Sequence, residues 1–141
     1  MIGHLSNAEI ETMLRRHRVG RIACSANDRP YVVPITYVYD AGLVYAYSVQ
    51  GRKIDVMREQ PLVCFEIDEV ETASSWRSVV AEGVFEELDD GPERSHALRR
   101  LVGREHPVPI AVCAPAAGLD RAIVFRIRLT EKSGRFERRD A

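Results

Sequence analysis

The residues best suited to chemistry lie in one short segment, residues 45–53, which reads Tyr-Ala-Tyr-Ser-Val-Gln-Gly-Arg-Lys. A strand would end at Ser48, Gly51 permits a sharp turn, and two adjacent cations would open a helix. The free backbone N–H groups at a helix start favour an anion. Arg52 can grip phosphate oxygens with its planar guanidinium, Lys53 adds a point charge, and Ser48 can donate one more hydrogen bond. On this pattern alone, a solvated basic helix start is the stronger interpretation, and phosphate binding is the alternative.

Two flanking segments add polar backbone and aromatic groups. Residues 31–37 form a strand pattern interrupted by Pro34, and proline cannot donate to a sheet ladder, so we expect an edge strand or a bulge. Backbone groups freed there could bind a planar heterocycle, although a simple bend of the strand explains the proline equally. Further on, Trp76, Ser78 and Val80 would share one face of a strand. Trp76 could alternatively be a core or interface anchor.

Other catalytic arrangements have little support. The three cysteines and four histidines are scattered, with no C-x-x-C or H-E-x-x-H spacing, so we expect no metal site. There is no G-x-G-x-x-G and no G-x-x-x-x-G-K-[ST] motif, which leaves a dinucleotide-binding or P-loop fold without support. We also find no Ser-His-Asp or Cys-His pairing and no carboxylate pair that must act as acid and base. The catalytic residues are therefore unknown from sequence, as is common when a cofactor carries the chemistry.

The composition is that of an ordinary globular protein. The 141 residues include 20 Lys and Arg against 21 Asp and Glu, with a formal net charge of −1. This balance excludes global attraction to nucleic acid or an anionic membrane. The longest uncharged stretch, residues 107–119, contains three prolines and is shorter than the roughly 20 apolar residues of a membrane span. The length suits one domain, residues 1–141. We expect a cytoplasmic protein, because the N-terminus lacks the apolar core of a signal peptide.

Periodicity and turn signals predict the elements that would position these residues. Ser6 and Glu9 have the spacing of a capping box at the start of the first helix. We expect three short helices, at residues 5–17, at residues 50–58 and from Pro92 onward. We expect about six strands, at residues 19–26, 31–39, 43–48, 62–68, 76–88 and 122–130. Residues 103–121 would form a long loop. Tight turns imply antiparallel pairing, hence a mainly β fold, a small barrel or sandwich with helices at its ends.

The order of these segments resembles the FMN-binding split-barrel proteins related to pyridoxamine 5'-phosphate oxidase, especially the short branch that includes nitroimidazole-resistance-like proteins. The resemblance runs from about residue 14 to residue 88. Its five motifs are V-G-R-I-A from Val19, P-Y-V-V-P-I-T-Y-V-Y from Pro30, Y-S-V-Q-G-R-K from Tyr47, E-Q-P-L-V-C-F-E from Glu59 and W-R-S-V-V-A-E-G from Trp76. No single motif is very specific, but five in the right order are, and they make phosphate binding by Arg52 and Lys53 the favoured interpretation.

The resemblance implies a split β-barrel and a homodimer with two FMN molecules at the subunit interface. Position by position, Arg52 and Lys53 would hold the FMN phosphate, with both side chains reachable by solvent. Tyr47 and Ser48 would lie beside it. The backbone along the isoalloxazine and ribityl chain would belong to Val33, Pro34, Ile35 and Thr36. Ser78, and less surely Trp76, would meet the cofactor or line its pocket.

The resemblance also sets the functional alternatives. The leading hypothesis is an FMN-dependent oxidoreductase acting on a small-molecule substrate, with a nicotinamide or another electron donor. Nitroimidazole-resistance-like relatives often place a histidine near the flavin where this chain has Tyr47, which argues against that specific activity. No tryptophan follows Trp76 to close over a pyridoxal ring, so vitamin B6 oxidation is disfavoured. The alternatives are a flavin-binding redox carrier or sensor without turnover, and a split barrel that binds the deazaflavin F420 or haem. We expect neither nucleic acid nor a membrane as a partner.

Overall fold

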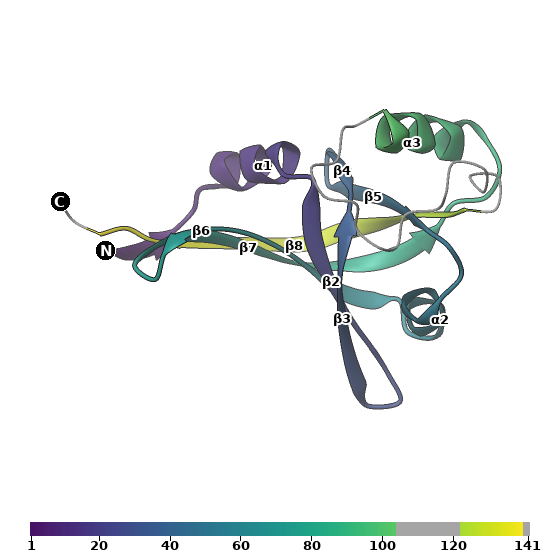
Figure 1. The fold of residues 1–141 in the computed structure, drawn as a ribbon, viewed down its shortest axis with the longest axis horizontal. Coiled ribbons are helices and arrows are strands. Elements are labelled where there is room, and N and C mark those ends of the chain that lie inside the picture. Colours follow the sequence, from purple (N-terminus) through teal and green to yellow (C-terminus); the bar gives the residue numbers. More distant parts are fainter. Residues whose placement is uncertain (104–121, 140–141) are drawn as a thin grey trace.

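The computed structural model describes residues 1–103 and 122–139, and within these ranges the chain forms an eight-stranded antiparallel sheet and three helices (Figure 1). The strands are β1 Ile2–His4, β2 Val19–Ala26, β3 Arg29–Thr36, β4 Val38–Asp40, β5 Leu43–Ser48, β6 Leu62–Thr72, β7 Ser75–Glu87 and β8 Ile123–Glu137. The helices are α1 Asn7–Arg16, α2 Arg52–Glu59 and α3 Pro92–Val102.

The sheet is built around its three longest strands. The order is β3-β2-β6-β7-β8-β5-β4, with β1 paired to β8. Strands β6, β7 and β8 run side by side along the long axis, whereas the β2–β3 hairpin projects away from them (Figure 1). Because β3 and β4 end the order without pairing to each other, the described sheet does not close. Strand β3 is therefore an edge strand, which confirms the prediction made from Pro34.

The core fills one face of this curved sheet. Ile22, Phe65 and Ala81 occupy one cross-strand row of β2, β6 and β7, and all three are buried. Helix α1 lies over this face and begins with the predicted capping box, in which Ser6 and Glu9 each bind the backbone of the other. No helix within the described ranges is long and apolar enough to span a lipid bilayer.

The expected number of about six strands is wrong, because the described residues form eight. Strand β1 has three residues, too few to give a periodic signal, and β4 is separated from β3 by a break at Tyr37. The other predicted strands exist, although β6 and β8 extend well beyond their expected ends at residues 68 and 130. The predicted loop at residues 103–121 lies outside the described residues, apart from Gly103.

The opposite side of the sheet includes three exposed apolar side chains. Val32 on β3 is 64% exposed, Leu62 on β6 is 65% exposed and Val80 on β7 is 46% exposed. The strand registers place these residues on the side away from the core, together with Arg21 and Glu66. We call this surface the open sheet face. Exposed apolar side chains gathered on one face of a sheet are typical of interaction sites.

Candidate functional site

The two cations predicted to bind phosphate stand at the start of α2, but in different environments. The helix begins after Gly51 and packs against β2 through Lys53, Ile54 and Met57. Arg52 is exposed, whereas Lys53 is only 6% exposed. The expectation that solvent reaches both side chains is therefore wrong for Lys53. Lys53 lies with Ile54 and Met57 on the buried face of α2, so its side chain is covered while Arg52 remains on the solvent side.

The β2–β3 hairpin forms the wall opposite these cations. The Arg52 guanidinium lies over the Tyr31 ring, 4.7 Å from its centroid. Cys24 is the register partner of Tyr31. Burial raises the pKa of the Cys24 thiol, and the charge of Lys53 acts in the opposite direction, so the ammonium lies near β2. No carboxylate of the described residues lies within ion-pair distance of Arg52, which leaves its donors available to an anion.

The end of β5 brings the predicted serine and tyrosine to the same region. Ser48 is fully buried and its hydroxyl donates to the Val49 carbonyl at 2.7 Å. Tyr47 is half-buried on the other side of the strand. A loop of three residues, 49–51, joins β5 to α2, so Ser48 and the helix start remain neighbours along the chain.

The predicted backbone contacts lie on the edge strand β3. Ile35 and Thr36 are buried, Val33 is half-buried and Pro34 is exposed. Within the described sheet β3 pairs only with β2, so the outer edge of β3 has no ladder partner. Backbone groups on that edge can bind a planar polar ligand, and Tyr31 on the same strand joins this edge to Arg52.

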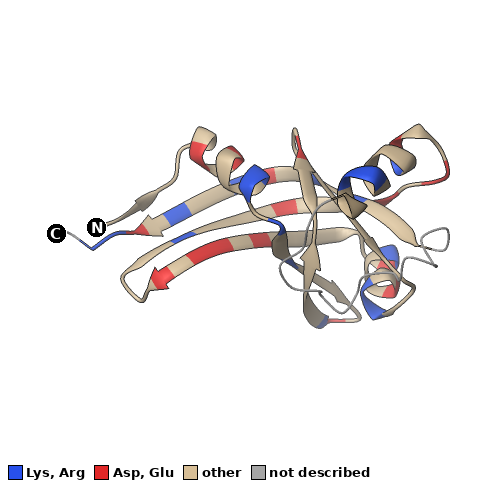
Figure 2. Ribbon diagram, turned by 45° about the horizontal axis from the view of Figure 1, so that its top comes forward, with Lys and Arg blue, Asp and Glu red and all other residues tan. Residues whose placement is uncertain are grey.

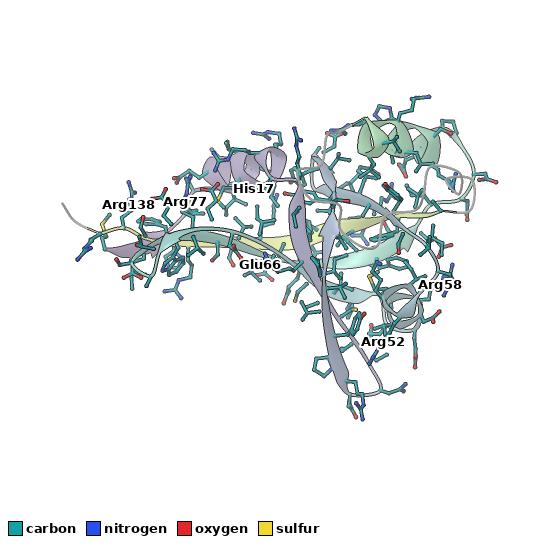
Figure 3. The ribbon with its side chains drawn as sticks, in the orientation of Figure 1. His17, Arg52, Arg58, Glu66, Arg77 and Arg138 are labelled. Atoms are coloured by element: carbon teal, nitrogen blue, oxygen red, sulfur yellow. The ribbon has the colours of Figure 1, made fainter. Side chains whose placement is uncertain are left out.

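The last two predicted residues, Trp76 and Ser78, lie on β7, in another part of the fold. Trp76 and Ser78 flank Arg77 on β7, and Figure 3 shows Arg77 and Arg52 at opposite ends of the molecule. The Trp76 indole donates to Glu137 at 2.9 Å, beside a cavity of about 320 Å³. One chain therefore brings together the predicted residues of β3, β5 and α2, but not those of β7.

A second cavity adjoins Arg52, and the sequence analysis did not predict it. It lies between the β2–β3 turn and α2 and has a volume of about 310 Å³. We call it the hairpin groove. Its polar and aromatic lining comprises Asn27, Arg29, Tyr31, Arg52, Asp55 and Glu59. The sequence indicates one wall of this groove, the turn at residues 27–30. It does not indicate the other wall, because α2 comes next to that turn only through tertiary packing.

Acidic residues follow one another along β6 (Figure 2), and Glu66 among them lies on the open sheet face beside Arg21. Arg21 lies 3.4 Å from Glu66 and 3.4 Å from Asp68. Burial, together with the neighbouring Asp68 carboxylate, raises the pKa of Glu66 to about 7, against the opposing effect of Arg21. Within the described residues no cluster of three or more His, Cys, Asp or Glu could hold a metal ion.

Comparisons with known proteins identify the family. The family model described as pyridoxamine 5'-phosphate oxidase matches residues 6–136. An uncharacterised protein of Rhizobium meliloti, RA0666, is 32% identical over 143 residues, covering 93% of this chain and 92% of the relative. The chain belongs to the pyridoxamine 5'-phosphate oxidase family.

Solved structures agree with this assignment. A FAD-binding protein of Mesorhizobium loti is 35% identical, with a TM-score of 0.84 over 98% of this chain and 99% of that chain. A Bacteroides thetaiotaomicron protein described as a 5-nitroimidazole antibiotic resistance protein is 18% identical, with a TM-score of 0.75 over 96% and 87% of the two chains. The second likeness establishes the fold alone. The mainly β, split-barrel fold expected from the sequence is thus confirmed.

Proposed function

We propose that the chain is an oxidoreductase that binds a flavin nucleotide. The phosphate attached to the ribityl chain of the flavin would bind at the start of α2. The observation that carries the proposal is the placement of Arg52 and Lys53 at a helix N-terminus, beside Ser48 and the edge of β3. Family membership and the FAD-binding relative support a flavin. FMN is the smallest flavin that carries the required phosphate.

The residues of the chain would bind and orient this cofactor. Arg52 offers a planar pair of donors and Lys53 a charge whose position is restricted by burial. The outer edge of β3 offers backbone groups to the polar side of the ring system, and Pro34 withholds one donor there. When bound, the flavin supplies hydride and electron transfer, so the protein needs no nucleophile of its own.

The proposed site is completed by a second copy of the chain. Arg77, the residue between Trp76 and Ser78 on β7, lies far from Arg52 within one chain (Figure 3), so Trp76 and Ser78 would reach the same flavin from a partner subunit. The open sheet face, with Val32, Leu62 and Val80 exposed, is the surface that such a partner would cover. These two observations support the proposal of a homodimer with shared flavin sites.

Removing the Arg52 guanidinium tests the phosphate assignment. Hydrogen bonds to charged groups are worth about 1.5–3 kcal/mol, so Arg52→Ala should weaken FMN about tenfold to a hundredfold. Riboflavin lacks the phosphate, and its affinity should stay unchanged. Arg58→Ala is the matched control, since Arg58 lies on the same helix but binds Glu87 at 2.8 Å. If Arg52→Ala weakens FMN and riboflavin equally, or neither, the phosphate binds elsewhere.

A redox carrier without turnover is the second candidate, because no acid, base or nucleophile is required by the arrangement. Anaerobic mixing with NADH, NADPH or reduced F420 distinguishes the two functions. Flavin reduction followed by reoxidation with a small-molecule acceptor supports the enzyme. The visible spectrum of the purified protein separates a flavin from haem.

A further inference from the structure

The charges of Arg21, Glu66 and Asp68 on the open sheet face do not balance. Arg21 lies 3.4 Å from Glu66 and 3.4 Å from Asp68, and both distances begin at the same guanidinium nitrogen, Nη1. This Arg21–Glu66–Asp68 cluster therefore holds two carboxylates against one cation. The side chains of Glu66 and Asp68 are 30% and 33% exposed, so a partner that covers this face would remove the water they still contact.

The surroundings of Glu66 add more negative than positive charge. In the strand register, Glu66 lies between Arg21 on β2 and the apolar Val80 on β7. On this face, the three cross-strand rows centred on Glu66 carry these other ionisable side chains: Arg21 on β2, Cys64 and Asp68 on β6, Glu82 on β7, and Glu131 and Arg135 on β8. On the side of α1, His17 binds Glu69 at 2.7 Å, and burial lowers the pKa of His17. Carboxylates thus outnumber cations around Glu66.

Assembly of two identical faces would bury this excess charge twice. In a two-fold dimer both subunits contribute the same surface patch, so each cluster is accompanied by its symmetry copy. An uncompensated charge is costly to remove from water, and a carboxylate avoids that cost by taking up a proton. Burial and the Asp68 carboxylate already raise the pKa of Glu66 to about 7, against the effect of Arg21. Glu66 is therefore the group best placed to take up the proton.

We propose that the Arg21–Glu66–Asp68 cluster makes assembly of the homodimer proton-dependent, with each subunit taking up one proton from solvent at Glu66 when the two open sheet faces meet. The dimer, and with it the shared flavin site, then forms more readily at acid than at alkaline pH. This inference rests on the proposed function, because it takes the open sheet face to be the dimer interface. It assigns a regulatory role to charges that flavin binding does not use.

Sedimentation of the FMN-loaded protein over a dilution series at pH 6 and at pH 8 tests the inference. The dissociation constant of the wild-type dimer should rise by about tenfold to a hundredfold between these pH values, because deprotonation of Glu66 opposes assembly by up to about tenfold in each subunit. The fraction of bound flavin should fall in parallel. Glu66→Gln resembles the protonated side chain and cannot ionise. Its dissociation constant at both pH values should therefore stay close to that of wild type at pH 6.

Two further variants separate the cluster from a general effect of charge. Asp68→Asn leaves Arg21 to pair with Glu66 alone, so its dissociation constant should change by less than about threefold between pH 6 and pH 8. Asp90→Asn makes the same chemical change at an exposed carboxylate next to α3. This control variant should keep the full pH dependence of wild type.

The outcomes separate the inference from the proposed function. A wild-type dissociation constant that does not rise with pH would overturn the proton link and leave the homodimer intact. The same conclusion would follow if Glu66→Gln or Asp68→Asn kept the wild-type pH dependence. A protein that is monomeric at both pH values and still holds its flavin would overturn the shared site, and this inference with it.

Discussion

At the scale of single residues, Arg52 and Lys53 illustrate what a sequence pattern can and cannot convey. Their adjacency at a helix start was visible in the sequence and led to the correct helix. The burial of Lys53 was also predictable in principle, because Lys53, Ile54 and Met57 share one face of α2. The contact of Arg52 with Tyr31 was not predictable, because it joins two elements that are distant in sequence.

This difference in burial predicts unequal effects on folding. In the flavin-free protein, Lys53→Ala should lower the free energy of unfolding by about 2 kcal/mol, because about three buried methylene groups are lost. Arg52→Ala removes an exposed cation–π contact worth about 0.5–1 kcal/mol. Urea denaturation of the two variants measures the difference. Equal losses would mean that the stem of Lys53 contributes no packing.

Glu66 predicts a pH dependence of stability. Its pKa rises from the ordinary value of 4.5 to about 7 in the folded chain, through burial and then the neighbouring Asp68, against the effect of Arg21. The folded state then binds more protons than the unfolded state between these values, so the free energy of unfolding should fall as pH rises from about 4.5 to 7. Denaturation of Glu66→Gln across this range should give a flatter curve.

The exposed Glu71 on the same strand provides the control for this measurement. Glu71→Gln should keep the wild-type slope. A wild-type curve that rises or stays level between pH 5 and pH 7, with no difference from Glu66→Gln, would contradict the assigned environment.

At the scale of elements, the strands that were predicted well are those with local signals. Strand β2, the β2–β3 turn and β5 carry apolar runs bounded by turn residues, and α1 carries its capping box. Strand β8 was predicted only to residue 130, because residues 131–137 are polar and include Gly134. Long-range pairing with β7 overrides weak local propensity there. The groove beside α2 was not predictable for the same reason.

Gly134 has a packing reason that can be tested. A Cβ atom at this position would lie 2.8 Å from Leu5 Cδ1 and 3.0 Å from Ile10 Cγ1, so α1 could not keep its distance from β8. Gly134→Ala should therefore destabilise the chain by about 1–3 kcal/mol, as overpacking of a core does. Ser133→Ala, at the exposed neighbouring position, should change the free energy of unfolding by less than about 0.5 kcal/mol. Similar thermal midpoints for the two variants would contradict this packing.

At the scale of the whole molecule, the proposed function depends on a surface and not only on a pocket. The predicted site residues divide into a group at α2, β3 and β5 and a group at β7, and Figure 3 shows Arg52 of α2 far from Arg77 of β7. The open sheet face includes β3, which carries part of the first group, and β7, which carries the second, with apolar residues around the Arg21–Glu66–Asp68 cluster. A second copy placed on this face would bury the apolar residues and bring β7 of one subunit toward the flavin of the other.

A charge on the open sheet face should therefore disrupt both assembly and cofactor binding. Sedimentation of wild type at micromolar concentration should give a mass near twice 15.9 kDa. Val80→Arg should sediment as a monomer and lose flavin affinity, because a long charged side chain would stand between the two apolar faces and lose its hydration on assembly. Val102→Arg, at a similarly exposed position on α3 (50% against 46% for Val80), should stay dimeric and keep its flavin. A wild-type monomer that holds flavin tightly would refute the shared site, whereas a dimeric Val80→Arg with unchanged flavin affinity would place the interface on another surface.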